Sequence, residues 1–215
     1  MMAKAPKPGA VKTRLVPPLT LDQASGLTRA FIGDIAHRMA ATPASLWLAH
    51  GPDDVPTDFD GLLPPGFDFL VQHGADLGAR MADLIERRLA AGASSVCLIG
   101  SDLPSLPAEI LVEALRLLDL PGDRAVLGPA VDGGYYLIGL KRPHPGLFDR
   151  MVWSTPTVMA ETLGRAASLA LPTASLSMVE DIDDPAALDR LARRLTVDPS
   201  LAPRTATFLA ALETY

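Results

Sequence analysis

A short cationic loop at the start of the chain carries the residues best suited to chemistry. Its positive side chains belong to Lys4, Lys7, Lys12 and Arg14. The chain has only four lysines, its net charge is −6, and its first acidic residue is Asp22. Pro6, Pro8 and Gly9 favour a fixed turn that brings backbone N–H groups close to phosphate oxygens, so the loop predicts a pocket for a small anion. On the spacing alone, a solvated chain end with incidental charge is an equally open interpretation.

Carboxylates later in the chain could hold a divalent cation. Asp102 follows an apolar run, Ser95–Ile99, which predicts a buried strand in the middle of a sheet. Proteins bind Mg²⁺ through one or two carboxylates plus substrate phosphates, which favours a metal role for Asp102 over a helix cap, for which Ser105 is better placed. Asp181 and Asp183 alternate along extended chain, so both could face one cation, or both could be solvated acids.

Two further segments could contact a ligand. The sequence Asp132-Gly133-Gly134 precedes a strand, and its glycines would allow close backbone approach of a ligand. A plain hairpin turn is the favoured interpretation, because Asp-Gly is a strong hairpin signal. Arg80 lies near a predicted helix N-terminus, where it could reach phosphate or remain on the surface.

The composition excludes several classes of protein. A pI near 5.1 without a long basic run argues against nucleic-acid binding. The single cysteine, Cys97, excludes internal disulfides and a thiolate metal cluster, and its apolar surroundings predict an inert core residue. No apolar stretch reaches the ~18 residues of a membrane span, and the first residues lack the apolar core of a signal peptide. We therefore expect a cytoplasmic protein with no membrane partner.

Alternating strand and helix patterns would position these residues. We expect strands at 45–50, 67–71, 95–99, 125–127 and 135–140. Helices are expected after Thr20, after Asp76, from Pro107, and at the Thr155-Pro156 and Asp184-Pro185 pairs. This alternation predicts an α/β fold, a three-layer α/β/α sandwich with a mainly parallel, Rossmann-like sheet, formed by residues 1–215 as one domain.

Six segments, in this order, resemble a known family. They are Lys4-Ala-Pro…Pro8-Gly9…Lys12-Thr-Arg-Leu15, Gly74…Asp76-Leu-Gly…Arg80-Met81, Gly100-Ser-Asp102-Leu-Pro104, Gly128-Pro-Ala…Asp132-Gly-Gly-Tyr-Tyr-Leu-Ile-Gly-Leu140, Trp153-Ser-Thr155 and Asp181-Ile-Asp183-Asp-Pro185. The chain thus resembles the transferases associated with radical-SAM and selenium-domain genes. Those proteins are similar to 2-phospho-lactate guanylyltransferase, within the nucleotide-diphospho-sugar transferase superfamily (GT-A fold).

The resemblance implies a role for each segment. Nucleotide binding would fall to Lys4, Pro8, Gly9, Lys12, Thr13, Arg14, Asp76 and Arg80. Mg²⁺ or Mn²⁺ would be held by Asp102, Asp181 and Asp183. A small-molecule acceptor would be bound by Asp132, Gly133, Gly134, Trp153, Ser154 and Thr155. Lys12, Arg14 and Asp102 would be the catalytic residues. Relatives carry several more apolar residues before the first lysine, so either the first strand is very short here or the natural chain begins earlier.

Three functions fit these residues. Nucleotidyl transfer from a triphosphate to a phosphate- or carboxylate-bearing acceptor is favoured, because it needs positioning and charge neutralisation but no covalent nucleophile. The first alternative is a glycosyltransferase that uses a nucleotide sugar. Such enzymes typically carry an Asp-x-Asp motif on this fold, whereas Pro104 stands two positions after Asp102. The second alternative is a non-catalytic nucleotide-binding module.

Overall fold

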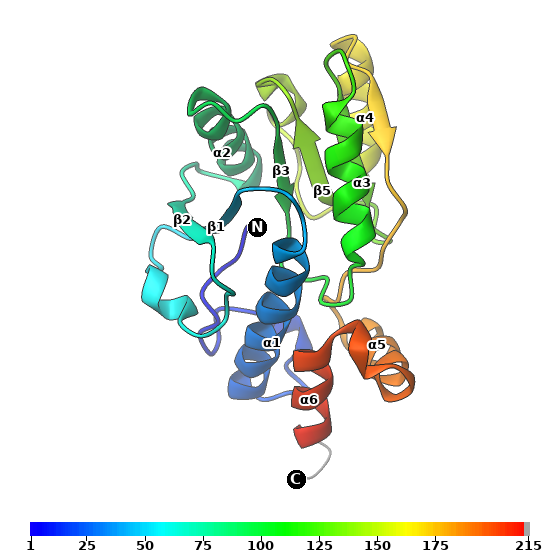
Figure 1. The fold of residues 1–215 in the computed structure, drawn as a ribbon. Helices are drawn as coiled ribbons and strands as arrows, with labels where there is room; N and C mark the ends of the chain where they lie inside the picture. The colour runs from blue at the N-terminus through cyan, green and yellow to red at the C-terminus, as the bar shows by residue number, and fades with distance from the viewer. Residues whose placement is uncertain (213–215) are drawn as a thin grey trace. The chain divides into compact units, whose positions relative to one another are not determined.

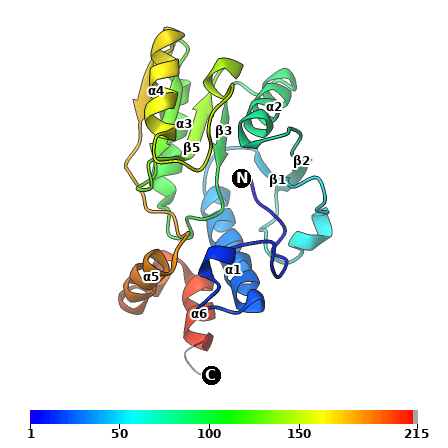
Figure 2. The same ribbon diagram turned by 180° about the vertical axis from the view of Figure 1, so that it is seen from behind.

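The computed structural model describes residues 1–212, which form two compact units made of discontinuous segments (Figures 1 and 2). The first unit holds residues 1–70, 101–108 and those from 181 onward, and the second holds 71–100 and 109–180. The single domain expected for residues 1–215 stays a prediction. None of the helices in the described part has both the length and the apolar character that a bilayer span requires.

The first unit combines a two-stranded sheet with three helices. The strands are β1 (Leu46–His50) and β2 (Phe67–Val71), and the helices are α1 (Leu21–Ala40), α5 (Pro185–Val197) and α6 (Pro203–Leu212). Met2 pairs with Ala49 of β1 in the parallel sense, and the N–H of Ala3 donates to the Ala49 carbonyl at 3.0 Å. The first residues of the chain therefore add a single parallel β-bridge to β1.

Helix starts in this unit follow both local and distant signals. The capping box predicted at Thr20 is present, since its hydroxyl accepts from the Gln23 N–H and the Gln23 side chain accepts from the Thr20 N–H. Asp184 likewise caps α5 through the Ala187 N–H at 2.7 Å. The start of α6 depends instead on Asp34, a buried residue of α1 whose carboxylate accepts from backbone N–H groups of α6. The sequence pattern did not predict α6, because its N-terminal partner lies about 170 positions away.

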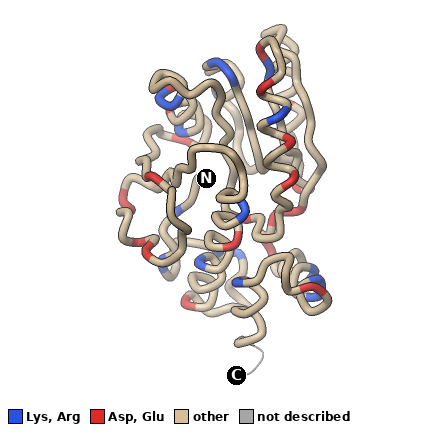
Figure 3. Tube along the Cα trace, viewed as in Figure 1, with Lys and Arg blue, Asp and Glu red and all other residues tan. Residues whose placement is uncertain are grey.

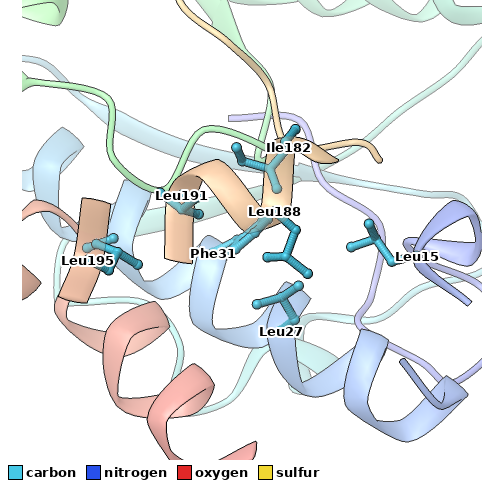
Figure 4. Close-up of a cluster of buried hydrophobic side chains, with 9 residues drawn as sticks. Leu15, Leu27, Phe31, Ile182, Leu188, Leu191 and Leu195 are labelled. Atoms are coloured by element: carbon cyan, nitrogen blue, oxygen red, sulfur yellow. The ribbon is translucent and has the colours of Figure 1, made fainter. Parts of the chain in front are cut away.

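An apolar cluster packs the loop after the cationic segment against α1 and α5 (Figure 4). Its buried members are Leu15, Leu27, Phe31, Ile182, Ala187, Leu188, Leu191, Leu195 and Ala202. Fully burying a leucine side chain stabilises the folded state by roughly 1.5–3 kcal/mol, so this cluster fixes the backbone on either side of it. Leu15 ends a short 3-10 turn and Ile182 lies in a loop, and both segments adjoin candidate site residues.

The second unit is built around a four-stranded sheet in the order β3-β5-β4-β6. The strands are β3 (Val96–Ile99), β4 (Ala125–Pro129), β5 (Tyr135–Leu140) and β6 (Thr173–Ser175), and the helices are α2 (Leu77–Ala90), α3 (Ala108–Asp119) and α4 (Val158–Ser168). Strand β5 is antiparallel to both β3 and β4, whereas β6 is parallel to β4. Three of the four strands therefore run in one direction, as a mainly parallel α/β sheet requires.

Two local predictions in this unit are wrong. Strand β3 stands at one end of the sheet order rather than in its middle, and helix α2 packs against it, which accounts for an apolar run at that position. Helix α4 begins at Val158 rather than at Thr155-Pro156. The Thr155 hydroxyl donates back to the Val152 carbonyl at 3.0 Å, so this residue closes a turn before the helix instead of capping it.

Cys97 should be inert in the native protein, as its sequence context predicted. Its Sγ lies against Gly139 of the neighbouring strand, and burial raises the pKa of its thiol to about 12. An unperturbed cysteine has a pKa near 8.5, so at pH 8 we expect Cys97 to react with a disulfide reagent about a thousandfold more slowly than the unfolded chain. Labelling with and without guanidinium measures this ratio, and fast labelling of the native protein would contradict the assignment. Because the chain has one cysteine, the signal is unambiguous.

Candidate functional site

The cationic loop contains the turn that its prolines and glycine predicted. The Ala10 N–H donates to the Lys7 carbonyl at 3.0 Å, which closes a four-residue turn with Pro8 and Gly9 at its centre. Gly9 has a φ of +79°, the conformation that the third position of a type II turn requires and that glycine adopts without steric cost. A Cβ at Gly9 would have no neighbour within 4 Å, so the tip of the turn is open.

The Lys12 ammonium lies between two carboxylates from distant parts of the first unit. Its Nζ atom is 2.7 Å from Oδ1 of Asp102 and 2.7 Å from Oδ1 of Asp183. It also donates to the Ile182 carbonyl at 2.6 Å, and it lies 5.6 Å from the centre of the Phe31 ring. The sequence predicted a phosphate contact for Lys12 and a metal contact for the two acids, but it did not predict that the three charges would meet.

The three side chains of this charged cluster, Lys12, Asp102 and Asp183, differ in their exposure to solvent. The Lys12 side chain is only 5% exposed, whereas those of Asp102 and Asp183 are 40% and 43% exposed. Burial alone would lower the pKa of Lys12, but the two carboxylates more than offset it, and the net pKa is raised above the ordinary 10.5. Lys12 is therefore charged at neutral pH, and the carboxylates keep a face toward solvent.

The apolar cluster positions this group. Leu15 ends the 3-10 turn (Thr13–Leu15) that follows Lys12, and Ile182 immediately precedes Asp183; both are buried among the leucines of α1 and α5 (Figure 4). The Ile182 N–H also donates to the Asp102 carbonyl at 3.1 Å, which ties the two acidic segments together. Because Asp102 is engaged in this way and α3 begins only at Ala108, Asp102 is not the cap of that helix.

The other cations of the loop have different surroundings. Lys7 is held by Asp58 at 2.8 Å and Asp54 at 3.3 Å, an exposed pair of contacts that contributes little stability. Lys4, Thr13 and Arg14 are exposed. Beyond this loop, from residue 22 to residue 212, Lys and Arg are interspersed with Asp and Glu (Figure 3).

The three acids predicted for the metal are not gathered into one cluster. Within residues 1–212, no group of three or more His, Cys, Asp or Glu side chains is arranged to hold a metal ion. Asp102 and Asp183 converge on one point through Lys12, and Asp181 lies two residues earlier in the chain. The chain therefore offers two converging carboxylates, which is the number that Mg²⁺ usually takes from a protein when substrate phosphates supply further ligands.

In the second unit, the segment Asp132–Gly134 forms the hairpin between β4 and β5, as the favoured interpretation predicted. Asp132 accepts a hydrogen bond from the Gly134 N–H at 2.8 Å, and Gly133 has a φ of +89°. A Cβ at Gly133 would lie 2.2 Å from the Pro156 carbonyl oxygen, a distance that no side chain tolerates. The hairpin is thus packed against the loop that contains Trp153, Ser154 and Thr155.

Trp153 connects this loop to the start of α2. Its indole lies against Gly78, where a Cβ would meet the ring at 2.7 Å, and it packs edge-on against Tyr135 with ring centroids 6.3 Å apart. Tyr135 takes this position at a β-bulge, because Gly128 pairs with Leu137 while the next residue of β4 pairs with Tyr135. Bulges commonly re-aim a side chain in this way. Gly78 had no predicted role of its own, although a glycine in the first turn of an amphipathic helix was a usable signal.

Two predicted nucleotide-binding residues also lie at the start of α2. The Asp76 carboxylate accepts from the Ala79 N–H at 2.8 Å and so caps the helix. The Arg80 Nε donates to the Gly74 carbonyl at 3.2 Å. These contacts give both residues a structural role, and their binding of nucleotide stays a prediction.

The comparisons with known proteins identify the fold. Residues 34–155 match the family described as "Uncharacterized protein conserved in bacteria (DUF2064)". A crystal structure from Desulfovibrio desulfuricans G20, described as a "putative nucleotide-diphospho-sugar transferase", is 33% identical, with a TM-score of 0.90 over 99% of this chain and 93% of that one. No curated protein matches the chain. The predicted nucleotide-diphospho-sugar transferase fold is therefore confirmed, and the likeness to 2-phospho-lactate guanylyltransferase stays a prediction.

Two more distant structures share the fold. CMP:2-keto-3-deoxy-manno-octonic acid synthetase, solved with CTP, is 14% identical, with a TM-score of 0.53 over 79% of this chain and 88% of that one. Rv0371c from Mycobacterium tuberculosis H37Rv, solved with manganese, is 18% identical, with a TM-score of 0.50 over 88% of this chain and 95% of that one.

Proposed function

Since the chain belongs to the DUF2064 family and has a nucleotide-diphospho-sugar transferase fold, we propose that it is a metal-dependent, nucleotide-using transferase. The family model matches residues 34–155. The favoured reaction is nucleotidyl transfer from a triphosphate to a small acceptor bearing phosphate or carboxylate, with release of pyrophosphate. The observation that carries this proposal is the meeting of Lys12, Asp102 and Asp183 beside an open Pro-Gly turn. Lys12 would supply a cation that binds phosphate, and the two carboxylates would supply hard oxygen ligands for a divalent ion.

The chain's own residues would bind and orient the triphosphate. The turn at Pro8 and Gly9 presents open backbone to phosphate oxygens, as anion-binding loops do. Lys12 and Arg14 would stabilise the negative charge that develops on the departing pyrophosphate, and hydrogen bonds of this charge-assisted kind are about twice as strong as neutral ones. Because positioning and charge neutralisation dominate such reactions, a site without a nucleophilic side chain is sufficient.

The donor set fits Mg²⁺ or Mn²⁺. Asp102 and Asp183 would hold the ion, and Asp181, two residues before Asp183, stays a predicted third ligand. Both of the first two carboxylates are partly exposed and already point at one cationic atom, so they can accept a metal without refolding of the backbone. A bound divalent ion would neutralise phosphate charge and polarise the phosphorus centre under attack. Structures of the same fold hold CTP in one protein and manganese in another, which supports this pairing of ligands.

In the second unit, we assign acceptor binding to the hairpin residues Gly133 and Gly134 together with the loop Trp153–Thr155. The two segments pack directly on one another at Pro156, and the indole Nε1 of Trp153 is buried without a hydrogen-bond partner in the described chain. A buried N–H group without a partner costs about 1–3 kcal/mol, which an acceptor oxygen could offset.

A glycosyltransferase that uses a nucleotide sugar is the second candidate. The description of the 33% identical relative favours it. The Asp-x-Asp motif typical of such glycosyltransferases argues against this candidate, because position 104 is a proline and not an acid. The second carboxylate that contacts Lys12 comes instead from Asp183, far along the chain. The two candidate functions differ in whether a nucleoside triphosphate or a nucleotide sugar should stabilise the folded protein.

The test is thermal denaturation with each nucleoside triphosphate and with nucleotide sugars, in the presence and absence of Mn²⁺. A ligand at 100 times its Kd adds about 2.7 kcal/mol, which in a protein of this size raises Tm by roughly 5–10 °C. We expect one triphosphate to do so only with Mn²⁺, and Asp102→Asn to lose the effect.

The matched control is Asp189→Asn, since Asp189 is 68% exposed on α5 and pairs with Arg193. It should keep the full response. Stabilisation by a nucleotide sugar alone would favour glycosyl transfer, and no response to any nucleotide would refute the proposed function.

A further inference from the structure

One ammonium occupies the point on which the two proposed metal ligands converge. Lys12 Nζ contacts Asp102 and Asp183 at 2.7 Å each, with the Ile182 carbonyl at 2.6 Å. Oxygen ligands of this kind are also those that Mg²⁺ and Mn²⁺ require. An ammonium and a divalent ion cannot share the space between the same two oxygens, so binding of one must exclude the other.

The charge of the cluster favours such an exchange. Two carboxylates and one ammonium leave a net charge of −1, which a divalent cation in place of the ammonium would cancel. The carboxylates are open to solvent, with 40% and 43% of their side chains exposed, whereas Lys12 is almost fully covered. An incoming cation can therefore reach the carboxylates from solvent, whereas the ammonium is covered.

The backbone at Lys12 is fixed while its side chain is long. Lys12 has a φ of +47°, a left-handed conformation that is unusual for a residue other than glycine, and Leu15 anchors the following turn in the apolar cluster. The four-carbon stem and compact ammonium of lysine allow the charge to move while the Cα stays in place. The open turn at Gly9 belongs to the same loop, three residues earlier.

We propose that Lys12 is the resident counter-cation of the Asp102–Asp183 pair, and that a divalent ion arriving with the nucleotide displaces its ammonium, which then moves to the phosphate oxygens. The inference rests on the proposed function, because it takes the two acids as the metal ligands. Metal alone must then compete with Lys12 and binds weakly. Metal and triphosphate together bind cooperatively, since the phosphates give the displaced ammonium new anionic partners.

The experiment measures Mn²⁺ binding without nucleotide, by the loss of the free Mn²⁺ electron paramagnetic resonance signal. We expect Lys12→Met to bind Mn²⁺ at least tenfold more tightly than the wild type, because the variant has lost the competing charge. Lys141→Met is the matched control: Lys141 donates to the Leu120 carbonyl in the second unit, and its removal should leave the affinity unchanged. If Lys12→Met does not melt cooperatively, Lys12→Gln, which keeps a hydrogen-bond donor but no charge, should show the same gain.

Equal or weaker Mn²⁺ binding by the folded Lys12 variants would overturn the inference. The wild-type response to triphosphate and Mn²⁺ then shows how far the failure extends. If wild type is still stabilised by the two ligands together, only the role of Lys12 as counter-cation fails. If wild type shows no such stabilisation either, the proposed function fails with it.

Discussion

Replacing Lys12 with alanine is expected to lower kcat for pyrophosphate release by about 10²- to 10³-fold, the loss typical when one preorganised charge or donor is removed from a developing anion. Lys12 is the buried cation of the loop, and its contacts with Asp102 and Asp183 place it beside the proposed metal ligands. Because the leaving pyrophosphate gains charge as the reaction proceeds, the loss should fall on kcat more than on KM. The measurement is a pyrophosphate-release assay at saturating triphosphate, Mg²⁺ and acceptor.

The control for this experiment is Lys141→Ala, which removes a lysine that donates to a single backbone carbonyl. It should retain wild-type kcat. Lys12→Arg keeps the charge but not the compact ammonium, and it should recover only part of the rate, because a planar guanidinium does not fit between two carboxylates and a carbonyl in the same way. Wild-type turnover by Lys12→Ala would sink the assignment of Lys12 to the leaving group.

Replacing Gly133 with alanine should destabilise the second unit by at least about 3 kcal/mol, since it combines backbone strain with a direct overlap. Gly133 has a φ of +89°, and its added Cβ would lie 2.2 Å from the Pro156 oxygen and 2.6 Å from its Cα. Both neighbours are backbone atoms, so a rotamer change cannot relieve the clash. We expect a fall in Tm of roughly 6–12 °C, or an outward shift of the loop that carries Trp153.

Gly122 offers a close internal control. Its φ is +87°, almost the same as that of Gly133, but a Cβ there would have nothing within 4 Å. Gly122→Ala should therefore cost only the strain of the left-handed conformation, about 1 kcal/mol. The difference in melting temperature between the two variants measures the cost of the steric overlap with Pro156. Trp153 fluorescence in a Trp47→Phe background reports whether the loop moves, and equal melting temperatures with unchanged fluorescence would contradict the packing described.

Short-range signals were readable from the sequence. The capping box at Thr20, the caps at Asp76 and Asp184, and the Asp-Gly hairpin at Asp132 all involve partners within three residues of one another. Such contacts depend on side-chain chemistry and spacing alone. The same local reasoning failed at Thr155-Pro156, where a turn and the packing of Pro156 on Gly133 delay the helix to Val158.

Long-range partners were not readable in this way. Asp34 caps a helix about 170 positions away, and Asp183 reaches Lys12 across 171 positions. No periodicity or motif in either segment specifies the other, because the two are brought together by the burial of apolar side chains such as Leu15 and Ile182. The sequence could suggest that Asp183 is a metal ligand, but not that its carboxylate would contact the Lys12 ammonium.

By itself, then, the sequence determined the α/β class, most element boundaries, the turn at Gly9 and the identity of the charged residues, since each of these depends on local spacing or on composition. Tertiary structure alone decided which charges meet. The apolar cluster around Phe31 and Leu188 places the Lys12 loop against the Asp183 segment, and the backbone bond from Ile182 to Asp102 adds the third partner. In water, attraction between charges is weak and is screened by salt beyond about 10 Å, so the packing of neutral side chains had to bring these three groups into contact.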